Sequence, residues 1–336
     1  MRNAVFFGEW KGTLGNVFCP SVREKLHTFL NFETDNVISK KEFDEYKDIL
    51  SRAYYAFSTW GMMTLTREEI REYLPNLKAV FYGAGSVQYF AREFLEEGID
   101  VFSAWAANAV PVAEYTFAQI ILATKGFFQR LHRQHRGADW SERNLPLAFP
   151  GNYEVKVGIA GAGMIGRLVI EKLKTLDKVT VLVFDPFLPD EKAEELGVTK
   201  VSLEELFRES DVISNHIANN PQTVGIFSGK LFDLMKPHGV FINTGRGAQV
   251  VEADMIKALR DVPTRVAVLD VTDPEPPMAD SPLYTLDNVF LTPHIAGSIG
   301  NEVHRMAEFM YEECKAYDAG EATRYGVSLK MLETMA

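Results

Sequence analysis

Three glycines lie at a spacing that suits the binding of a dinucleotide. Gly161, Gly163 and Gly166 follow the apolar run 157–160 in a G-x-G-x-x-G pattern, and a helical pattern follows them. The first glycine permits a tight turn, the second lets the backbone approach a pyrophosphate, and the third lets the helix pack against the strand. The unpaired N–H groups at such a helix start attract phosphate.

A carboxylate after the next apolar run indicates which dinucleotide is preferred. Asp185 follows 181–184, at about 20 residues beyond the last glycine, where this type of site places an acidic residue. Its side chain can accept a hydrogen bond from the ribose 2′-hydroxyl, and its charge repels a 2′-phosphate. The pattern therefore predicts NAD rather than NADP. A lone G-x-G-x-x-G is often only a loop, so the prediction depends on the surrounding strands and helix.

Three other side chains that can do chemistry follow later apolar runs. Arg246 lies between two glycines, Glu275 between two prolines, and His294 directly after a proline. Considered alone, two of these residues have a structural alternative: the arginine could be a surface residue in a turn, and the histidine a hydrogen-bonded residue of the core.

Together, these three side chains fit one reaction. An imidazole can donate a proton to a ketone oxygen while hydride reaches the carbon, and a carboxylate bonded to its second nitrogen fixes the tautomer. A guanidinium can bind the carboxylate of a 2-oxo acid and polarise its carbonyl group. Arg246, Glu275 and His294 therefore supply the groups that reduction of a 2-oxo acid requires.

The elements that must position these residues repeat along the chain. Six apolar runs, separated by helical stretches, cover 157–160, 179–184, 212–216, 240–243, 266–270 and 289–292. They predict a doubly wound parallel sheet, in which ligands bind beyond the carboxyl ends of the strands. Residues 1–103 also alternate strands and helices, which predicts a second α/β unit.

Two helices of this pattern have clear signals. One is expected to begin after Thr66, because Glu68 and Glu69 would lie in its first turn. A long helix is expected over 110–136, with Pro111 in its first turn.

Composition limits the class of protein. The 336 residues suggest about two domains, and 46% hydrophobic with 24% charged residues is typical of a globular chain. A net charge of −11 argues against a nucleic-acid surface. Cys19 and Cys314 lack metal-ligand spacing, so no metal is expected. Because no apolar run reaches about 18 residues and the first is too short for a secretory signal, we expect a cytoplasmic protein without a membrane partner.

The motifs resemble those of the D-isomer-specific 2-hydroxyacid dehydrogenase family. Residues 243–247, 269–276 and 292–297 are similar to its arginine, glutamate and histidine motifs, and the similarity extends over nearly the whole chain. The resemblance implies an NAD-dependent enzyme that interconverts a 2-oxo acid and a 2-hydroxy acid. The resemblance further implies that Arg246 binds substrate, that Glu275 supports His294, and that His294 is the general acid and base.

The resemblance also implies a set of binding residues. Implied cofactor contacts are Gly161, Gly163, Met164, Ile165, Gly166, Asp185, Ile217, Ala218, Thr223, Thr244, Gly245 and Asp270, the last beside the nicotinamide carboxamide. Ala84 and Gly85 belong to a loop whose N–H groups would meet the substrate carboxylate, and a plain glycine-rich turn is its alternative. Trp60 is a further substrate candidate, with a packing aromatic as its alternative. The aromatic content of this region, without a basic cluster near 83–85, favours an apolar or medium-sized substrate side chain over a phosphate.

The family fold implies how the chain is divided. A smaller, discontinuous, flavodoxin-like substrate domain would comprise 1–103 and 299–336, and the dinucleotide-binding domain would comprise 104–298. A homodimer is the expected assembly. A function of a different class remains open: an NAD-binding protein-interaction module, like the transcriptional corepressors that share this fold and keep the same three residues.

Overall fold

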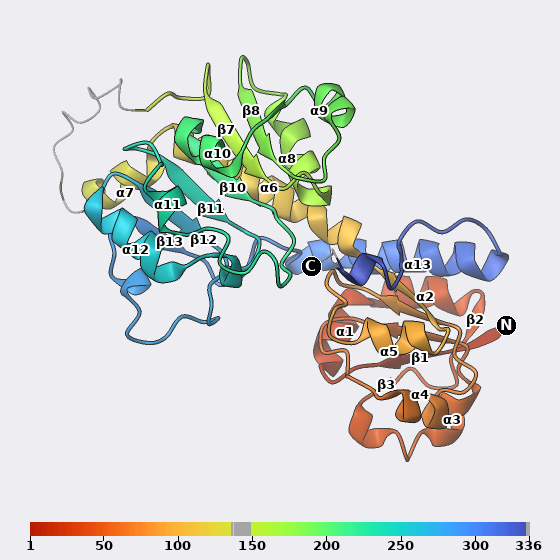
Figure 1. The fold of residues 1–336 in the computed structure, drawn as a ribbon. Helices are drawn as coiled ribbons and strands as arrows, with labels where there is room; N and C mark the ends of the chain where they lie inside the picture. Colours follow the sequence, from red (N-terminus) through yellow and green to blue (C-terminus); the bar gives the residue numbers. More distant parts are fainter. Residues whose placement is uncertain (136, 138–148, 334–336) are drawn as a thin grey trace. The chain divides into compact units, whose positions relative to one another are not determined.

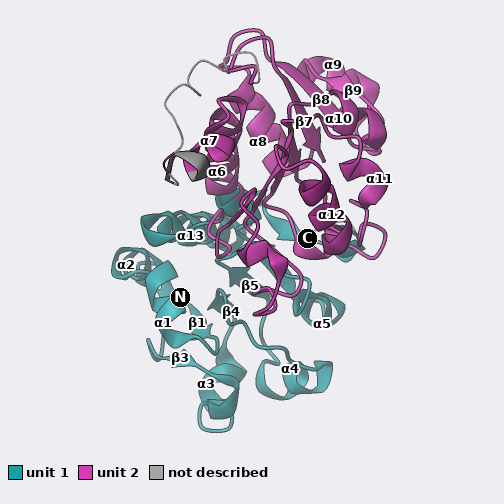
Figure 2. Cartoon of the chain, turned by 90° about the vertical axis from the view of Figure 1, so that its left-hand side faces the viewer, with its two compact units in different colours: residues 1–108, 298–336 teal, residues 109–297 magenta. Residues whose placement is uncertain are grey.

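The chain folds into two compact units. The computed structural model describes residues 1–135, 137 and 149–333 (Figure 1). Unit 1 comprises residues 1–108 and 298–336, and unit 2 comprises residues 109–297 (Figure 2). The sequence placed the two divisions after residues 103 and 298, whereas the compact units divide after residues 108 and 297.

Unit 2 is built around a seven-stranded parallel sheet. Its order is β13-β12-β11-β10-β7-β8-β9, the doubly wound order with one further strand at the β13 edge. The strands are β7 (Lys156–Ala160), β8 (Thr180–Phe184), β9 (Thr199–Lys200), β10 (Val212–Asn215), β11 (Val240–Asn243), β12 (Val266–Leu269) and β13 (Val289–Leu291). The six strands expected from the sequence are confirmed, and the two-residue β9 was missed.

Continuous apolar runs form these strands because helices cover both faces of the sheet. One face packs against α6 (Trp105–Thr124) and α8 (Met164–Leu173), where Ile120, Val169 and Leu173 are buried. The other face packs against α10 (Leu203–Glu209) and α12 (Glu252–Asp261). The remaining helical segments are α7 (Phe127–His135), α9 (Asp190–Leu196), α11 (Gly229–Phe232), η4 (Gly247–Gln249) and η5 (Pro282–Tyr284).

The single helix expected over 110–136 is wrong in its start and in its continuity. It begins at Trp105, so Pro111 lies inside α6 rather than in its first turn. It also breaks at Gly126, whose φ is +65°, before α7 begins. A Cβ at Gly126 would lie 2.6 Å from the Phe149 ring, so close packing requires glycine there. Arg136, the last residue of that expected helix, lies outside the described residues.

Unit 1 contains a second sheet with flavodoxin-like order. The path is β14-β6-β5-β4-β1-β2, β3 also pairs with β1, and only β14 is antiparallel to its neighbour. The strands are β1 (Arg2–Phe7), β2 (Leu30–Asn31), β3 (Val37–Ile38), β4 (Tyr55–Ser58), β5 (Ala79–Tyr82), β6 (Asp100–Ser103) and β14 (Gly326–Val327). The α/β class expected for both units is confirmed.

Two buried clusters hold helices on the faces of this second sheet. The C-terminal helix α13 (Val303–Ala319) buries Met306, Met310 and Cys314 in the cluster that also holds α1 (Lys11–Val17) and α2 (Pro20–His27). The other segments are η1 (Lys40–Glu42), α3 (Lys47–Arg52), α4 (Arg67–Tyr73), α5 (Ala91–Glu96), η6 (Gly300–Glu302) and η7 (Met331–Glu333). The expected start after Thr66 is confirmed, because its side chain accepts a hydrogen bond from Glu69 N. None of the helices in the described part of the chain is long and apolar enough to cross a membrane.

Candidate active site

The glycine turn after β7 uses each glycine for a different physical reason. Gly161 has a φ of +95°, and a Cβ there would lie 2.6 Å from the His216 carbonyl oxygen. A Cβ at Gly166 would lie 2.0 Å from the Gly161 oxygen, so this glycine lets α8 pack on the turn. Gly163 is the N-cap of α8, and a Cβ there would meet nothing within 4 Å. The open space at Gly163 is where a ligand could approach the backbone.

The first residues of α8 and the end of β8 complete this turn. Met164 and Ile165 open the helix, and Met164 is 48% exposed. The Asp185 carboxylate accepts hydrogen bonds from the N–H groups of Ala162 and Phe187, each at 2.8 Å. These bonds fix the carboxylate against the glycine turn, and its oxygens keep lone pairs for a further donor.

The loop after β10 lies against the same turn. Thr223 donates its hydroxyl to the Ala218 oxygen at 2.8 Å, and Gln249 donates to the Ile217 oxygen at 2.9 Å. His216 Nε2 lies 2.9 Å from Ser214 Oγ, and desolvation of the ring lowers the pKa of this imidazole to about 3. It therefore stays neutral around pH 7.

A buried amide network shapes the turn that carries Arg246. Asn215 and Asn243 end neighbouring strands at the same register, and Asn215 Nδ2 donates to both Asn243 Oδ1 and Gln249 Oε1. Asn243 in turn accepts from Gly245 N and donates to Arg246 O. Asn215 and Gln249 were missed from the sequence, although a polar residue at the end of an apolar run was a usable signal for Asn215.

The same turn places Thr244, Gly245 and Arg246. Thr244 is 8% exposed, with its hydroxyl 3.3 Å from that of Thr116 on α6. A Cβ at Gly245 would lie 2.7 Å from Asn215 Nδ2, so glycine is required. Arg246 Nη1 donates to Gly245 O at 2.7 Å. Burial lowers the pKa of the Arg246 guanidinium, and the nearby Glu275 carboxylate partly opposes that shift.

His294 and Glu275 form a direct pair. His294 Nδ1 lies 2.7 Å from Glu275 Oε1, and the two side chains are 47% and 42% exposed. Since Nδ1 is engaged, Nε2 is the ring nitrogen left to face a reactant. His294 also has a φ of +55°, a conformation that costs a non-glycine residue energy and often marks a functional position.

Asp270 holds the turn of His294 in this conformation. Its Oδ1 accepts from the Thr292 hydroxyl and from Ile295 N, and its Oδ2 accepts from Ala296 N, at 2.7 to 2.9 Å. The Thr292 proton is thereby used, so Tyr115 donates its own hydroxyl proton to Thr292. Thr292 and Tyr115 were missed from the sequence. The expected contact of Asp270 with a carboxamide stays a prediction.

The three substrate candidates of unit 1 lie at the carboxyl ends of its strands. Ala84 and Gly85 belong to the loop after β5, and Ala84 is completely buried. Trp60 follows β4 and packs against both buried clusters of unit 1, which agrees with the alternative that it is a packing aromatic. Trp10 covers Gly61, and it is the more exposed of the two tryptophans at 60%.

A parallel sheet of this order, with a glycine turn at the start of a helix, defines a dinucleotide-binding domain of the Rossmann class. Residues 117–296 match the model of the D-isomer specific 2-hydroxyacid dehydrogenase, NAD binding domain. The chain therefore belongs to the D-isomer-specific 2-hydroxyacid dehydrogenase family and carries its NAD-binding domain.

Individual proteins agree with this assignment. The chain is 31% identical over 257 residues to a glyoxylate reductase of Korarchaeum cryptofilum, covering 75% of this chain and 76% of that protein. It is 29% identical over 295 residues to a D-3-phosphoglycerate dehydrogenase of Archaeoglobus fulgidus, covering 87% and 53% respectively. The chain thus spans about half the length of that relative. A solved phosphoglycerate oxidoreductase from Rhizobium etli has the same fold, with a TM-score of 0.81, 22% identity, and coverage of 99% and 100%.

Two glycine variants separate packing from ligand binding. Gly166→Ala should destabilise the protein by about 1–3 kcal/mol, because its Cβ would collide with the Gly161 oxygen. Gly163→Ala has room for its Cβ, so it should change stability by about 1 kcal/mol or less but weaken NADH binding where the pyrophosphate approaches. Thermal unfolding and NADH titration by fluorescence measure both effects. Unchanged NADH affinity of a stable Gly163→Ala protein would contradict this position for the pyrophosphate.

Proposed function

We propose that the protein is an NAD-dependent D-2-hydroxyacid dehydrogenase that reduces a 2-oxo acid or runs the reverse reaction. The observation that supports this most directly is the His294–Glu275 pair at 2.7 Å, with Arg246 electrostatically coupled to the same carboxylate. The names of the relatives, dehydrogenases and reductases, favour an enzyme over a protein-interaction module. The homodimer, the cytoplasmic location and the domain roles expected from the sequence stay predictions.

The cofactor residues fit a dinucleotide. Open space at Gly163 lies beside the packed Gly161 and Gly166, and the Asp185 carboxylate is fixed next to them. Gly161, Gly163, Met164, Ile165 and Gly166 would hold the pyrophosphate, and Asp185 the adenosine ribose. The residues that would line the rest of the cofactor are Ile217, Ala218, Thr223, Thr244, Gly245 and Asp270.

The reaction requires hydride at C2 and a proton at the adjoining oxygen. When bound, the nicotinamide supplies the hydride, so NADH is oxidised as the 2-oxo acid is reduced. Protonated His294 gives its Nε2 proton to the carbonyl oxygen as the C=O double bond becomes a C–O single bond. Glu275 holds Nδ1 and stabilises the charged ring, and the half-exposed imidazole regains its proton from water. Arg246 binds the carboxylate and the developing negative charge.

Substrate binding would involve the loop with Ala84 and Gly85 in unit 1. Its N–H groups would bind the carboxylate of the 2-oxo acid, and Trp60 is the further candidate contact. The parallel strands of unit 1 all end at one edge of their sheet, so the loops after β1, β3, β4 and β5 surround that subsite.

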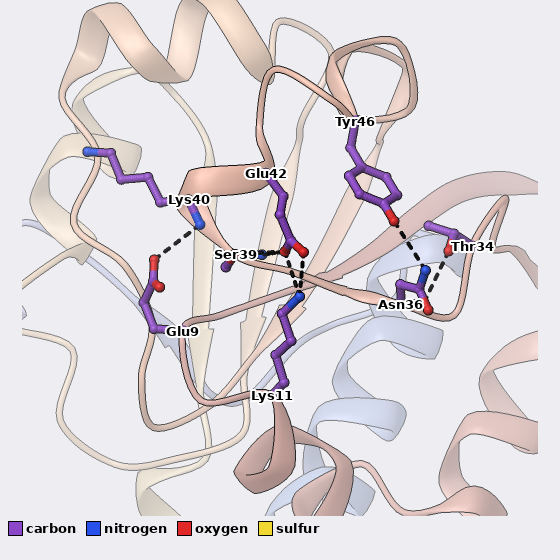
Figure 3. Close-up of polar contacts among 8 residues, drawn as sticks. All are labelled: Glu9, Lys11, Thr34, Asn36, Ser39, Lys40, Glu42 and Tyr46. Carbon is purple, nitrogen blue, oxygen red and sulfur yellow. Dashed lines mark hydrogen bonds and ion pairs between the residues drawn. The ribbon is translucent and has the colours of Figure 1, made fainter.

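The lysines of these loops indicate what the substrate side chain carries. Lys11 Nζ binds both oxygens of Glu42 at 2.6 and 2.7 Å, and Glu42 also accepts from the Ser39 N–H and hydroxyl (Figure 3). The Lys11 ammonium and the Ser39 donors lower the pKa of Glu42 to about 2, so it stays charged. Lys40 Nζ binds Glu69 at 2.7 Å. Because both ammonium groups are neutralised, we propose that the substrate side chain is uncharged. Lys41 is exposed, and it is the lysine to test for binding of a substrate phosphate.

A substrate series tests the reaction and the side chain together. We expect NADH oxidation, followed at 340 nm, with pyruvate, glyoxylate, hydroxypyruvate, 2-oxoisocaproate or phenylpyruvate, and a higher KM for 3-phosphohydroxypyruvate. No turnover of any oxo acid by a protein that binds NADH would contradict the proposed function. If the KM for the phosphorylated acid is low, and Lys41→Ala raises that KM, this lysine would instead be shown to bind the phosphate.

Removing the imidazole tests the proton-transfer role. His294→Ala should lower kcat by about 10²–10⁴-fold, because it removes the imidazole that is proposed to deliver the proton. NADH affinity should stay the same. The matched control is His304→Ala on α13, which should keep wild-type kcat. Near-normal turnover of His294→Ala would contradict the assigned role.

Asp185 provides a test of cofactor preference. Asp185→Ala removes the carboxylate that would bind the ribose 2′-hydroxyl and repel a 2′-phosphate. The ratio of kcat/KM for NADH to that for NADPH should fall by about tenfold, which corresponds to the loss of one charge-assisted hydrogen bond. Asp190→Ala, which removes an exposed carboxylate at the start of α9, is the control. An unchanged ratio would place the ribose contact elsewhere.

A further inference from the structure

The loop after β5 in unit 1 is held by its carbonyl groups. The Gly83 oxygen accepts a hydrogen bond from Thr59 Oγ1 at 2.7 Å, and the Ala84 oxygen accepts one from Ala104 N at 3.0 Å. The Gly85 oxygen lies 2.6 Å from Ser103 Oγ. Three successive carbonyl groups therefore each have a donor on the protein side of the loop.

Two of these donors are buried hydroxyls on the strands that flank β5. Thr59 directly follows β4 and is 1% exposed, and Ser103 ends β6 and is 0% exposed. Both neighbouring strands are in parallel register with β5, so the two hydroxyls approach the loop from opposite sides. Ser103 Oγ is also 2.9 Å from the Ala84 oxygen. Because that oxygen already accepts a hydrogen bond from Ala104 N, the single hydroxyl proton of Ser103 is available for the Gly85 oxygen.

Holding the carbonyl groups determines where the N–H groups point. In a planar trans peptide, the N–H of one residue points opposite to the carbonyl of the residue before it. The N–H groups of Gly85 and Ser86 therefore point away from Ala104 and Ser103. Neither N–H has an acceptor among the described residues, and both residues are partly exposed. A Cβ at Gly85 would meet only Asn108 Nδ2, at 3.5 Å, so the loop is not tightly packed at this residue.

We propose that Thr59 and Ser103 are positioning residues for the substrate. Thr59 fixes the first peptide plane of the loop 83–86, Ser103 fixes the plane that carries the Ser86 N–H, and together they hold the Gly85 and Ser86 N–H groups toward the carboxylate of the 2-oxo acid. Adjacent N–H groups that face the same way form an anion-binding concavity, which is what binding of the substrate carboxylate requires. The inference rests on the proposed function, and it adds two residues that touch neither substrate nor cofactor.

Isosteric variants test this role. Thr59→Val keeps the shape of the side chain and removes its hydroxyl, whereas Thr59→Ser keeps the hydroxyl; Ser103→Ala removes the other donor. The measurements are KM and kcat for the best 2-oxo acid, KM for its neutral amide, and the Kd of oxamate for the NADH complex. Because the carboxylate keeps its charge during the reaction, its binding affects KM rather than kcat.

The expected result is specific to the carboxylate. Thr59→Val and Ser103→Ala should each raise the KM for the acid and the Kd of oxamate about tenfold, in line with the loss of a preorganised charge-assisted hydrogen bond. The kcat, the NADH affinity and the KM for the amide should change much less, and Thr59→Ser should resemble the wild type.

Other outcomes overturn the inference in distinguishable ways. Unchanged KM and oxamate Kd in Thr59→Val and Ser103→Ala would show that the hydroxyls do not aim the loop. An equal loss for acid and amide, together with weaker NADH binding, would show a general structural defect. A wild-type protein that binds NADH but reduces no 2-oxo acid would refute the proposed function and this role with it.

Discussion

Buried parallel strands leave polar groups at their carboxyl ends, and each of these groups needs a hydrogen-bond partner. In unit 2, Asn215, Asn243 and Gln249 satisfy one another and thereby fix the turn of Arg246. The Asp270 carboxylate, only 2% exposed, requires three donors, and the turn of His294 supplies them. The turns of Arg246 and His294 are thus placed by the hydrogen bonds of their buried neighbours.

This arrangement explains how an unfavourable conformation is retained. A positive φ at a residue such as His294 costs of the order of 1–3 kcal/mol, so the surroundings must compensate. Removing donors from the buried Asp270 carboxylate would cost at least as much, because an unpaired buried charge is expensive. The His294–Glu275 pair itself is about half exposed and contributes little stability. Its value lies in orienting the imidazole, while Asp270 provides the stability.

Unit 1 solves the same problem with neutral groups. Hydroxyls of Thr59 and Ser103, rather than amides or a carboxylate, satisfy the loop carbonyls at the carboxyl edge of its sheet. A hydroxyl donates a single proton, so it can fix a carbonyl and still leave the adjacent N–H groups unused. The charged groups of the neighbouring loops neutralise one another, as Lys11 and Glu42 do. The unused N–H groups of this loop can bind the one carboxylate of the proposed substrate. The neutralised charges around them do not favour a second anionic group on its side chain.

The sequence by itself determined what depends on local chemistry. Continuous apolar runs predicted the strands of unit 2, and the spacing of Gly161, Gly163 and Gly166 predicted the turn. A Cβ would collide with the backbone at Gly161 and Gly166, whereas Gly163 leaves open space for a ligand. The residue types at Arg246, Glu275 and His294 indicated an acid, its carboxylate partner and an anion-binding group, although their roles stay predictions. The motifs also indicated the family, which the match over 117–296 shows.

Only the tertiary structure decided what depends on contacts between distant segments. The Phe149 ring packs where a Cβ at Gly126 would lie, and a helical pattern does not reveal that contact. Asn215 meets Gln249, and Thr59 meets Gly83, because parallel pairing brings strand ends together whatever their separation along the chain. Local periodicity specifies which residues are buried, but the partner of a buried polar group is fixed only when the sheet order and register are formed.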